Sequence, residues 1–162
     1  MRFKGKTVVV TGGSKGIGLA IAMRFAEEGA NLVLASIEPV VAEAAERLRA
    51  TGAAAIGVIC DVIQRDSVVA LYERAISELG PVDISVQNAG IITVSRVEDL
   101  TEADWDATMA VNTKGAFLCC QEAIRHMRAA RKGGRLINIA SGQAREEFIY
   151  RHIANTPCRR MA

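Results

Sequence analysis

The chain has 162 residues, a formal net charge of +2, 50% hydrophobic residues and only 4% aromatic ones. These values predict one soluble globular α/β domain with an aliphatic core, and they exclude a disordered chain or a disulfide-stapled secreted scaffold. The basic surplus comes from arginines after residue 150, so the rest of the chain is nearly neutral and we expect no nucleic-acid partner.

The spacing of the cysteines indicates whether the chain binds a metal, and the length of its apolar runs indicates whether it enters a membrane or is secreted. The four cysteines are Cys60, Cys119, Cys120 and Cys158. They form no CxxC pair and no zinc-site spacing with histidine, which predicts reduced thiols and no metal site. No segment has the ~18 consecutive apolar residues of a membrane span, and the VVV run near the N-terminus is shorter than the ~7 residues of a signal-peptide core. We therefore expect a cytoplasmic protein without a membrane partner.

Short apolar runs alternate with longer helical patterns along the chain. Strands are predicted at 6–11, 31–36, 55–60, 82–87 and 134–140. Helices are predicted at 17–28, 39–50, 66–79 and 101–130. Each strand is rich in Val, Ile or Leu at consecutive positions, the pattern of strands that are buried on both faces. The alternation predicts the α/β class, as a doubly wound, Rossmann-type parallel sheet of about five strands with helices on both faces.

Several helix ends carry capping signals. Gly29 and Gly80 suit C-terminal caps, and Pro39 suits a first helical position. Thr101 and Asp104 have the spacing of a capping box. We expect the helix boundaries close to these residues.

The first strand leads into TGGSKGIG, residues 11–18, with glycines in the turn and at the start of the next helix. A turn without side chains lets backbone N–H groups approach a pyrophosphate, and a helix N-terminus favours the anion. The spacing matches neither glycine fingerprint of dinucleotide-binding folds. A Walker motif also fails, because Leu19 and Ala20 stand where Lys and Ser/Thr belong. By itself the turn predicts either a phosphate site or only a tight bend.

Polar or glycine-rich segments end the other strands as well. Ser36 to Glu38 follow the second strand, Asp61 and Val62 the third, residues 88–90 the fourth and Ser141 the fifth. The carboxyl ends of parallel strands share one edge of the sheet, where ligands of open α/β sheets bind. The sequence therefore predicts a ligand site along this edge.

The segment VNTKGAF lies inside the predicted helix 101–130. Asn112 and Gly115 are poor helix-interior residues, and Gly costs about 1 kcal/mol relative to Ala. A binding or catalytic role would explain them. Close packing around Gly115, with Asn112 bonded to a neighbouring backbone, would explain them too, and the residue types alone favour this second explanation.

Five segments in this order resemble the short-chain dehydrogenase/reductase family: TGGSKGIG, CDV, NAG, VNTKGAF and RLINIAS, within residues 4–145. The resemblance implies a nicotinamide cofactor, NAD or NADP, and hydride transfer between this cofactor and a small-molecule alcohol or carbonyl substrate. It also implies a dinucleotide-binding Rossmann domain at 1–145 and an irregular tail at 146–162, a remnant of the substrate-binding part.

The resemblance implies a role for each matching residue. Asn112 would belong to a proton relay and Ser141 would hydrogen-bond the reacting oxygen, which makes these two the candidate catalytic residues. The glycine turn would hold the diphosphate, Asp61 and Val62 would contact adenine, and residues 88–90 would line the nicotinamide ribose. The implied cofactor-binding residues are Gly12, Ser14, Lys15, Gly16, Ile17, Gly18, Ser36, Asp61, Val62, Asn88, Ala89, Gly90 and Val111.

The choice between NAD and NADP depends on two charged residues. Ser36 stands where the family's ribose-binding acid usually ends the second strand, and Glu38 follows two residues later. An acid accepts hydrogen bonds from the 2′-OH and repels a 2′-phosphate. Lys15 resembles the basic residue that NADP-dependent members place near that phosphate, although an ordinary exposed lysine explains it too. The balance leans to NADP.

The family's catalytic tyrosine and lysine have no counterpart here. The family places the tyrosine a dozen or so residues beyond the serine, but residues 153–155 are Ile, Ala and Asn, and Tyr150 comes too early. A free tyrosine has a pKa near 10, and in the family the lysine and the charge of the cofactor lower it so that the tyrosine can work near pH 7. Without this pair, Ser141 and Asn112 can orient a substrate but cannot readily move its proton. The segment NTPCRRMA resembles one that members place after the substrate loop. Truncation, a reading-frame error and omitted residues would each explain why the segment with the tyrosine and lysine is missing.

Two other functions remain open. One is a dinucleotide-binding module without turnover. The other is a Rossmann-like methyltransferase, which also needs a glycine turn and an acid after the second strand but leaves NAG, Asn112 and Ser141 unexplained.

The predicted fifth strand would form an edge of the sheet, which bears on whether the chain self-associates. If nothing follows RLINIA, its apolar edge has unpaired backbone groups. We therefore expect a homo-oligomer, or aggregation, through this edge or the 101–130 helix. A monodisperse monomer by light scattering at micromolar concentration would contradict this.

Overall fold

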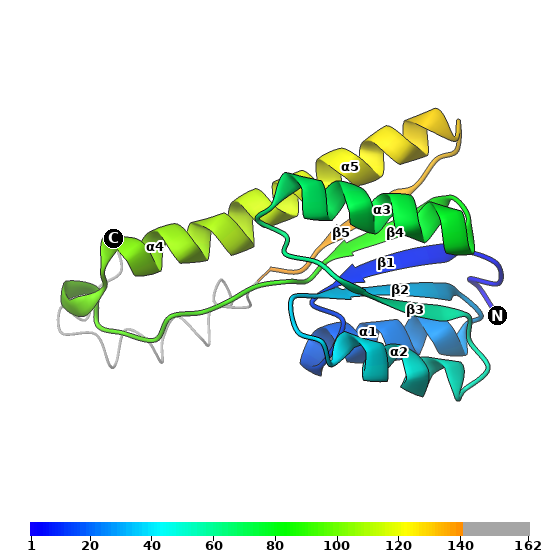
Figure 1. Ribbon diagram of the computed structural model, residues 1–162, viewed down its shortest axis with the longest axis horizontal. Helices are drawn as coiled ribbons and strands as arrows, with labels where there is room; N and C mark the ends of the chain where they lie inside the picture. The colour runs from blue at the N-terminus through cyan, green and yellow to red at the C-terminus, as the bar shows by residue number, and fades with distance from the viewer. Residues whose placement is uncertain (141–162) are drawn as a thin grey trace.

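The computed structural model describes residues 1–140 of the chain (Figure 1). Five parallel strands form one sheet in the order β3-β2-β1-β4-β5. The strands are β1 (Thr7–Thr11), β2 (Asn31–Ser36), β3 (Ala55–Ile59), β4 (Val82–Gln87) and β5 (Arg135–Asn138). The order runs outward in both directions from β1, so the predicted doubly wound parallel sheet of Rossmann type is confirmed.

Helices cover both faces of this sheet. In Figure 1, α1 and α2 lie on one face and α3 and α5 on the other, while α4 extends beyond the sheet. The helices are α1 (Gly16–Glu27), α2 (Val41–Arg49), α3 (Arg65–Leu79), α4 (Glu102–Met109) and α5 (Ala116–Ala129). A short 3₁₀ turn, η1, spans Val97–Asp99, and a π-helical segment, η2 (Ala110–Gly115), joins α4 to α5. Within residues 1–140, no helix is long and apolar enough to cross a membrane.

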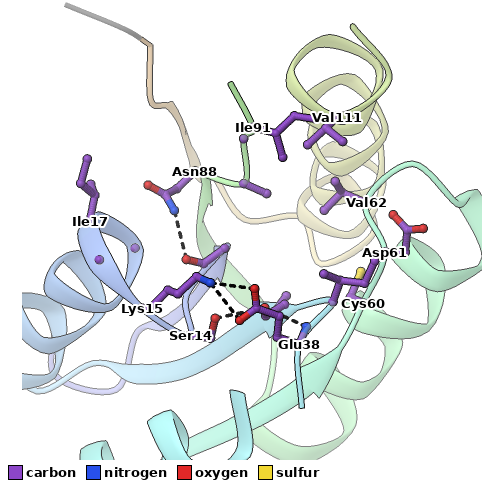
Figure 2. A pocket seen from close by; sticks show the side chains of 18 residues that line it. Ser14, Lys15, Ile17, Glu38, Cys60, Asp61, Val62, Asn88, Ile91 and Val111 are labelled. Carbon is purple, nitrogen blue, oxygen red and sulfur yellow. Dashed lines mark hydrogen bonds and ion pairs between the residues drawn. The ribbon is translucent and has the colours of Figure 1, made fainter. Parts of the chain in front are cut away.

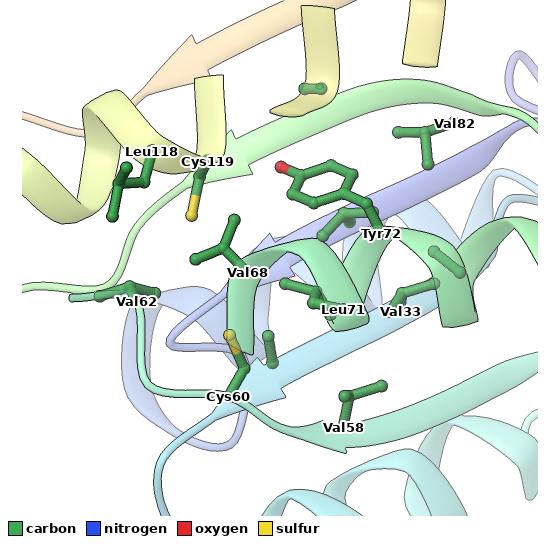
Figure 3. Close-up of a cluster of buried hydrophobic side chains, with 14 of the residues drawn as sticks. Val33, Val58, Cys60, Val62, Val68, Leu71, Tyr72, Val82, Leu118 and Cys119 are labelled. Carbon is green, nitrogen blue, oxygen red and sulfur yellow. The ribbon is translucent and has the colours of Figure 1, made fainter. Parts of the chain in front are cut away.

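The core has two layers because successive side chains of a strand point to opposite faces. Val8 and Val10 of β1 pack with the α1 and α2 side, whereas Val9 packs with the α3 and α5 side. Figure 3 shows the second layer, in which the fully buried ring of Tyr72 lies between α3 and the sheet. Its hydroxyl is 2.6 Å from Ser85 Oγ, which satisfies both buried polar groups.

The helix-end signals have mixed outcomes. The C-terminal caps are confirmed, since Gly29 and Gly80 have φ of 86° and 83°, and Thr101 and Asp104 form the capping box. The prediction for Pro39 is wrong, because α2 begins two residues later. The amides of residues 41 and 42 bond to the carbonyls of residues 38 and 39, so Pro39 belongs to a turn that precedes the helix.

The last strand differs from its prediction. β5 covers 135–138 rather than 134–140, and Arg135, Ile137 and Asn138 are exposed. Burial on both faces is therefore wrong for this strand. Among residues 1–140, β5 pairs only with β4 and forms an edge of the sheet. Self-association through this edge stays a prediction. The proposed domain boundary at residue 145, Ser141 and Cys158 lie outside the described residues.

Candidate functional site

The carboxyl ends of β1 to β4 surround one pocket of about 590 Å³ (Figure 2). This volume lies within the ~300–1,000 Å³ of ordinary ligand sites. Every residue that the sequence marked for cofactor contact lines the pocket. The lining also includes Ala35, Ile37, Cys60 and Ile91, for which the sequence predicts no cofactor contact, and Glu38, which bears only on the choice between NAD and NADP. Each of these residues lies one or two positions from a predicted cofactor-binding residue at the end of a strand. The signal for them in the sequence is therefore their closeness to the strand ends.

The turn between β1 and α1 requires glycine at three positions, two for their backbone angles and one for lack of space. Gly12 and Gly16 have φ of 64° and 55°, which other residues rarely adopt. A Cβ at Gly18 would overlap the carbonyl oxygen of Gly12 and lie 2.5 Å from Asn88 Nδ2. At Gly16 a Cβ would meet nothing within 4 Å, so this part of the turn is open. An anion can therefore approach the turn at the start of α1.

Gly13 has a different role from the other glycines of the turn. A Cβ there would lie 2.9 Å from the carbonyl oxygen of Val10 and 3.1 Å from Leu34 Cδ2. Gly13 therefore packs the turn onto the sheet and does not line the pocket.

Asn88 connects the end of β4 to the glycine turn. Its Nδ2 donates to the carbonyl oxygens of Thr11, at 3.0 Å, and Gly12, at 3.2 Å. In return, Thr11 Oγ1 accepts the backbone N–H groups of Asn88 and Ala89, both at 3.1 Å. These bonds hold two walls of the pocket together (Figure 2).

Two side-chain contacts connect the glycine turn to the end of β2, in addition to the backbone hydrogen bond from the Gly13 N–H to the Ala35 carbonyl oxygen at 3.1 Å. The Lys15 ammonium lies 2.7 and 3.0 Å from the carboxylate oxygens of Glu38. Ser14 Oγ donates to Ser36 Oγ at 3.1 Å, and the Glu38 N–H donates to the same Ser36 oxygen at 3.1 Å. Figure 2 shows this group at one side of the pocket.

Asp61 and Val62 form the wall beyond β3. Asp61 Oδ1 accepts the N–H of Ile63 at 3.1 Å, and Ser67 Oγ accepts the N–H of Asp61 at 3.0 Å. Asp61 thus caps its own loop while it lines the pocket. The neighbouring thiol of Cys60 is buried, and this burial raises its pKa. The thiol is therefore a poor nucleophile.

Asn112 lies in the π-helical segment and holds the chain that follows β4. Its Oδ1 accepts the N–H of Ile91 and its Nδ2 donates to the Ile91 carbonyl, both at 2.9 Å. A Cβ at Gly115 would lie 2.7 Å from Val62 Cγ2. Both parts of the packing explanation for VNTKGAF are therefore present. The predicted single helix at 101–130 needs correction, because these contacts accompany a π turn within it.

Residues 1–140 contain only one of the two candidate catalytic residues, Asn112. Asn112 is next to the pocket but does not line it, and Ser141 lies outside the described residues. Residues 1–140 hold no group of three or more side chains suited to a metal ion. The described part of the pocket therefore offers binding groups rather than a complete set for proton transfer.

The contact between Gly115 and Val62 can be tested by mutation. In Gly115→Ala the new methyl group would press on Val62, and overpacking typically costs about 1–3 kcal/mol, against about 1 kcal/mol gained in helix propensity. We expect the free energy of unfolding in urea to fall by about 1 kcal/mol. Adding Val62→Ala should make the effect of Gly115→Ala smaller. Additive effects of the two substitutions would contradict the contact.

A dinucleotide fits the chemistry of this pocket. The N-terminus of α1 faces it, and the first turn of that helix contains no acidic residue to repel a phosphate. The side chains of Ile17, Val62, Ile91 and Val111 provide apolar surface for planar rings.

Comparisons with known proteins agree with this description. The sequence model of the short chain dehydrogenase family matches residues 6–152. Versicolorin reductase of Emericella nidulans is 35% identical over 153 residues, which cover 93% of this chain and 57% of the relative. D-threitol dehydrogenase of Mycolicibacterium smegmatis is 38% identical over 154 residues, which cover 94% of this chain and 58% of the relative.

Solved structures are similar over the same part. A short-chain type dehydrogenase/reductase from Mycobacterium marinum superimposes with a TM-score of 0.83 at 34% identity, covering 86% of this chain and 57% of the other. A short-chain dehydrogenase/reductase from Burkholderia phymatum, determined in complex with NAD, has a TM-score of 0.83 at 32% identity and covers 87% and 50%. The chain thus spans about half the length of these relatives.

Proposed function

Because this chain belongs to the short-chain dehydrogenase/reductase family, we propose that its pocket binds NAD or NADP for hydride transfer between the cofactor and a small alcohol or carbonyl compound. One observation carries the proposal. The glycine turn and the ends of β2, β3 and β4 surround a single pocket of about 590 Å³. The relatives named above are reductases and dehydrogenases.

The residues of the pocket suggest an arrangement for the dinucleotide. The turn around Gly16 and the N-terminus of α1 would hold the diphosphate, because both present backbone N–H groups and a favourable field. Asp61 and Val62 would contact adenine, and residues 88–90 would line the nicotinamide ribose. When bound, the nicotinamide would supply the hydride chemistry. Asn112 would keep the segment at Ile91 in position beside it, through its two bonds to that backbone.

We propose that catalysis needs Asn112 together with Ser141, which lies outside the described residues. Ser141 would hydrogen-bond the reacting oxygen of the substrate, and Asn112 would belong to the proton relay. We propose NADP as the preferred cofactor, since Lys15 lies at the rim of the pocket and the strand-end residue Ser36 is uncharged.

The proposal is tested by direct binding. Isothermal titration of the 162-residue chain with NADPH and NADH is expected to give saturable binding of both, with NADPH bound more tightly. S-adenosylmethionine serves as the control ligand, because a Rossmann-like methyltransferase would bind it instead. Tighter binding of S-adenosylmethionine than of either nicotinamide dinucleotide would overturn the proposal.

A second candidate is a dinucleotide-binding module without turnover. The sequence favours it in one respect, since Ile153, Ala154 and Asn155 occupy the expected place of the catalytic tyrosine. Absorbance of the reduced nicotinamide separates the two candidates. Binding of NADPH without oxidation or reduction across a panel of alcohols and ketones would support the module.

A further inference from the structure

A second pocket, of about 260 Å³, lies between the N-terminal segment and α1. Its lining comes from the residues before β1 and from the last turns of α1, so it is at the amino edge of the sheet, opposite the edge with the larger pocket (Figure 1). The lining residues are Arg2, Phe3, Ile21, Arg24, Phe25 and Glu28. We call this the Phe3/Phe25 pocket. It shares no lining residue with the larger pocket.

Two segments of the chain build the Phe3/Phe25 pocket. Residues 21, 24, 25 and 28 recur at intervals of three and four, which places them on one face of α1 and its C-terminal cap. The N-terminal segment crosses this face. The Phe3 N–H donates to the Glu28 carbonyl oxygen at 3.0 Å, and the Gly5 N–H donates to the Gly29 carbonyl oxygen at 3.2 Å. Backbone hydrogen bonds therefore hold the two walls together.

The floor of the Phe3/Phe25 pocket is aromatic. The rings of Phe3 and Phe25 meet edge to face, with centroids 4.9 Å apart and planes at 64°. Both rings and Ile21 are half-buried and pack against the core layer below α1 and α2. Aromatic rings in such geometry attract one another beyond the burial of their area. A cavity of roughly 150 Å³ holds benzene, so the present volume of about 260 Å³ suits one ring or two fused rings.

Two guanidinium groups and one carboxylate form the polar part of the lining. Glu28 Oε1 accepts an N–H from Arg2 and an N–H from Arg24, both at 3.0 Å. Glu28 Oε2 accepts the backbone N–H of Arg2 at 3.1 Å. Arg24 also donates to Glu27, at 2.7 Å. Because Glu28 is already engaged by three donors, the pocket has no free carboxylate for a cationic ligand.

Arg2 is the group that can bind an anionic ligand. Its guanidinium donates to Glu28 through Nη2 alone, and the guanidinium carbon lies 5.6 Å from the centroid of the Phe3 ring. Within residues 1–140 its side chain makes no other hydrogen bond. The side chain is 68% exposed, so it can turn toward a ligand without leaving a buried site. A guanidinium has five N–H donors in a planar fork, which matches the two oxygens of a carboxylate.

We propose that the Phe3/Phe25 pocket binds a small aromatic carboxylate, with the ring of the ligand against Phe3 and Phe25 and its carboxylate on the free N–H groups of Arg2. A carboxylate alone would gain only an exposed ion pair, which is weak in water. The apolar floor adds burial of the ring, so the two contacts together select a molecule that has both groups. The inference is independent of the proposed function, because the two pockets share no residue.

A titration followed by NMR tests the site in the 162-residue chain, with 2-naphthoate as the probe. We expect saturable shifts of the backbone amides of Phe3, Ile21 and Phe25, with a Kd of about 1 mM or lower, as for other ligands of this size. The uncharged analogue 2-naphthylmethanol should bind about tenfold more weakly, because it cannot form the charge-assisted pair. Shifts at Gly16 and Asp61 instead would place the probe in the larger pocket and overturn the proposal.

Variants of Arg2 separate the contact from general attraction by positive charge. Arg2→Met should weaken 2-naphthoate binding about tenfold and change 2-naphthylmethanol binding less than about twofold, so the two probes then bind alike. Arg2→Lys should recover only part of the loss, since lysine keeps the charge but lacks the planar fork. Arg47→Met is the matched control, because Arg47 is an exposed arginine of α2 that lines neither pocket. It should leave both affinities unchanged.

Thermal unfolding of each variant shows whether the chain is folded when binding is measured. Absence of saturable shifts up to about ten times the expected Kd, in a wild-type chain with a normal unfolding transition, would overturn the site. Equal affinity of the wild-type chain for the two probes would overturn the role of the carboxylate. An undiminished preference for 2-naphthoate in folded Arg2→Met would overturn the role of Arg2.

Discussion

Gly18→Ala is expected to abolish measurable dinucleotide binding. The added methyl group would overlap the carbonyl oxygen of Gly12 and lie 2.5 Å from Asn88 Nδ2. Backbone atoms cannot rotate away as the end of a long side chain can, so the turn and the start of α1 must separate. We expect the Kd for NADPH to rise by about 100-fold or more, which corresponds to about 2.7 kcal/mol.

The same substitution should lower the free energy of unfolding by about 2–3 kcal/mol, as other overpacked sites do. Gly52→Ala is the control for stability, because Gly52 has a φ of 91° but a methyl group added there would meet nothing within 4 Å. Its strain of about 1–2 kcal/mol should leave NADPH affinity unchanged once the chain is folded. Normal binding by Gly18→Ala would show that the turn does not contact the dinucleotide as proposed.

Asn88→Asp should cause the second large loss. The substitution keeps the shape of the side chain but replaces a donor with an acceptor, next to the carbonyl oxygens of Thr11 and Gly12 that Asn88 now contacts at 3.0 and 3.2 Å. The new carboxylate oxygen would repel the carbonyl oxygens of Thr11 and Gly12, and these two carbonyls would lose the N–H groups that now donate to them. We expect urea unfolding at pH 7 to show a loss of about 3 kcal/mol, together with weaker NADPH binding.

The pH dependence of this loss has a definite sign. A protonated carboxyl can donate one hydrogen bond, so the carbonyl oxygens favour the protonated form and raise the pKa of the new aspartate. The stability lost at pH 7 should therefore be partly recovered as the pH falls through that raised pKa. Asn112→Asp is the comparison, because Asn112 makes a similar pair of bonds to Ile91 at an exposed site. Its smaller expected loss is about 1 kcal/mol, and an equal loss at both positions would contradict the importance of the Asn88 contact.

Local sequence determined much of the fold. The strands 31–36 and 82–87 begin and end where their apolar runs predict, because a consecutive aliphatic run has to be buried on both faces of a sheet. Thr101 and Asp104 form their capping box through bonds within a single turn, which needs no distant partner. The pocket could be anticipated for a similar reason. Once the strands are parallel, their ends share one edge, and polar residues at those ends must gather there.

Other features were decided only by contacts between distant parts of the chain. The π turn at 110–115 accompanies bonds from Asn112 to Ile91 and the close approach of Gly115 to Val62, which no local propensity encodes. The pairing of Lys15 with Glu38 likewise depends on β1 and β2 lying side by side. The exposure of β5 follows from its place at the edge of the described sheet rather than from its apolar composition. Residue type sets what a side chain can contact, but only the folded arrangement determines which partner is within hydrogen-bonding or van der Waals distance.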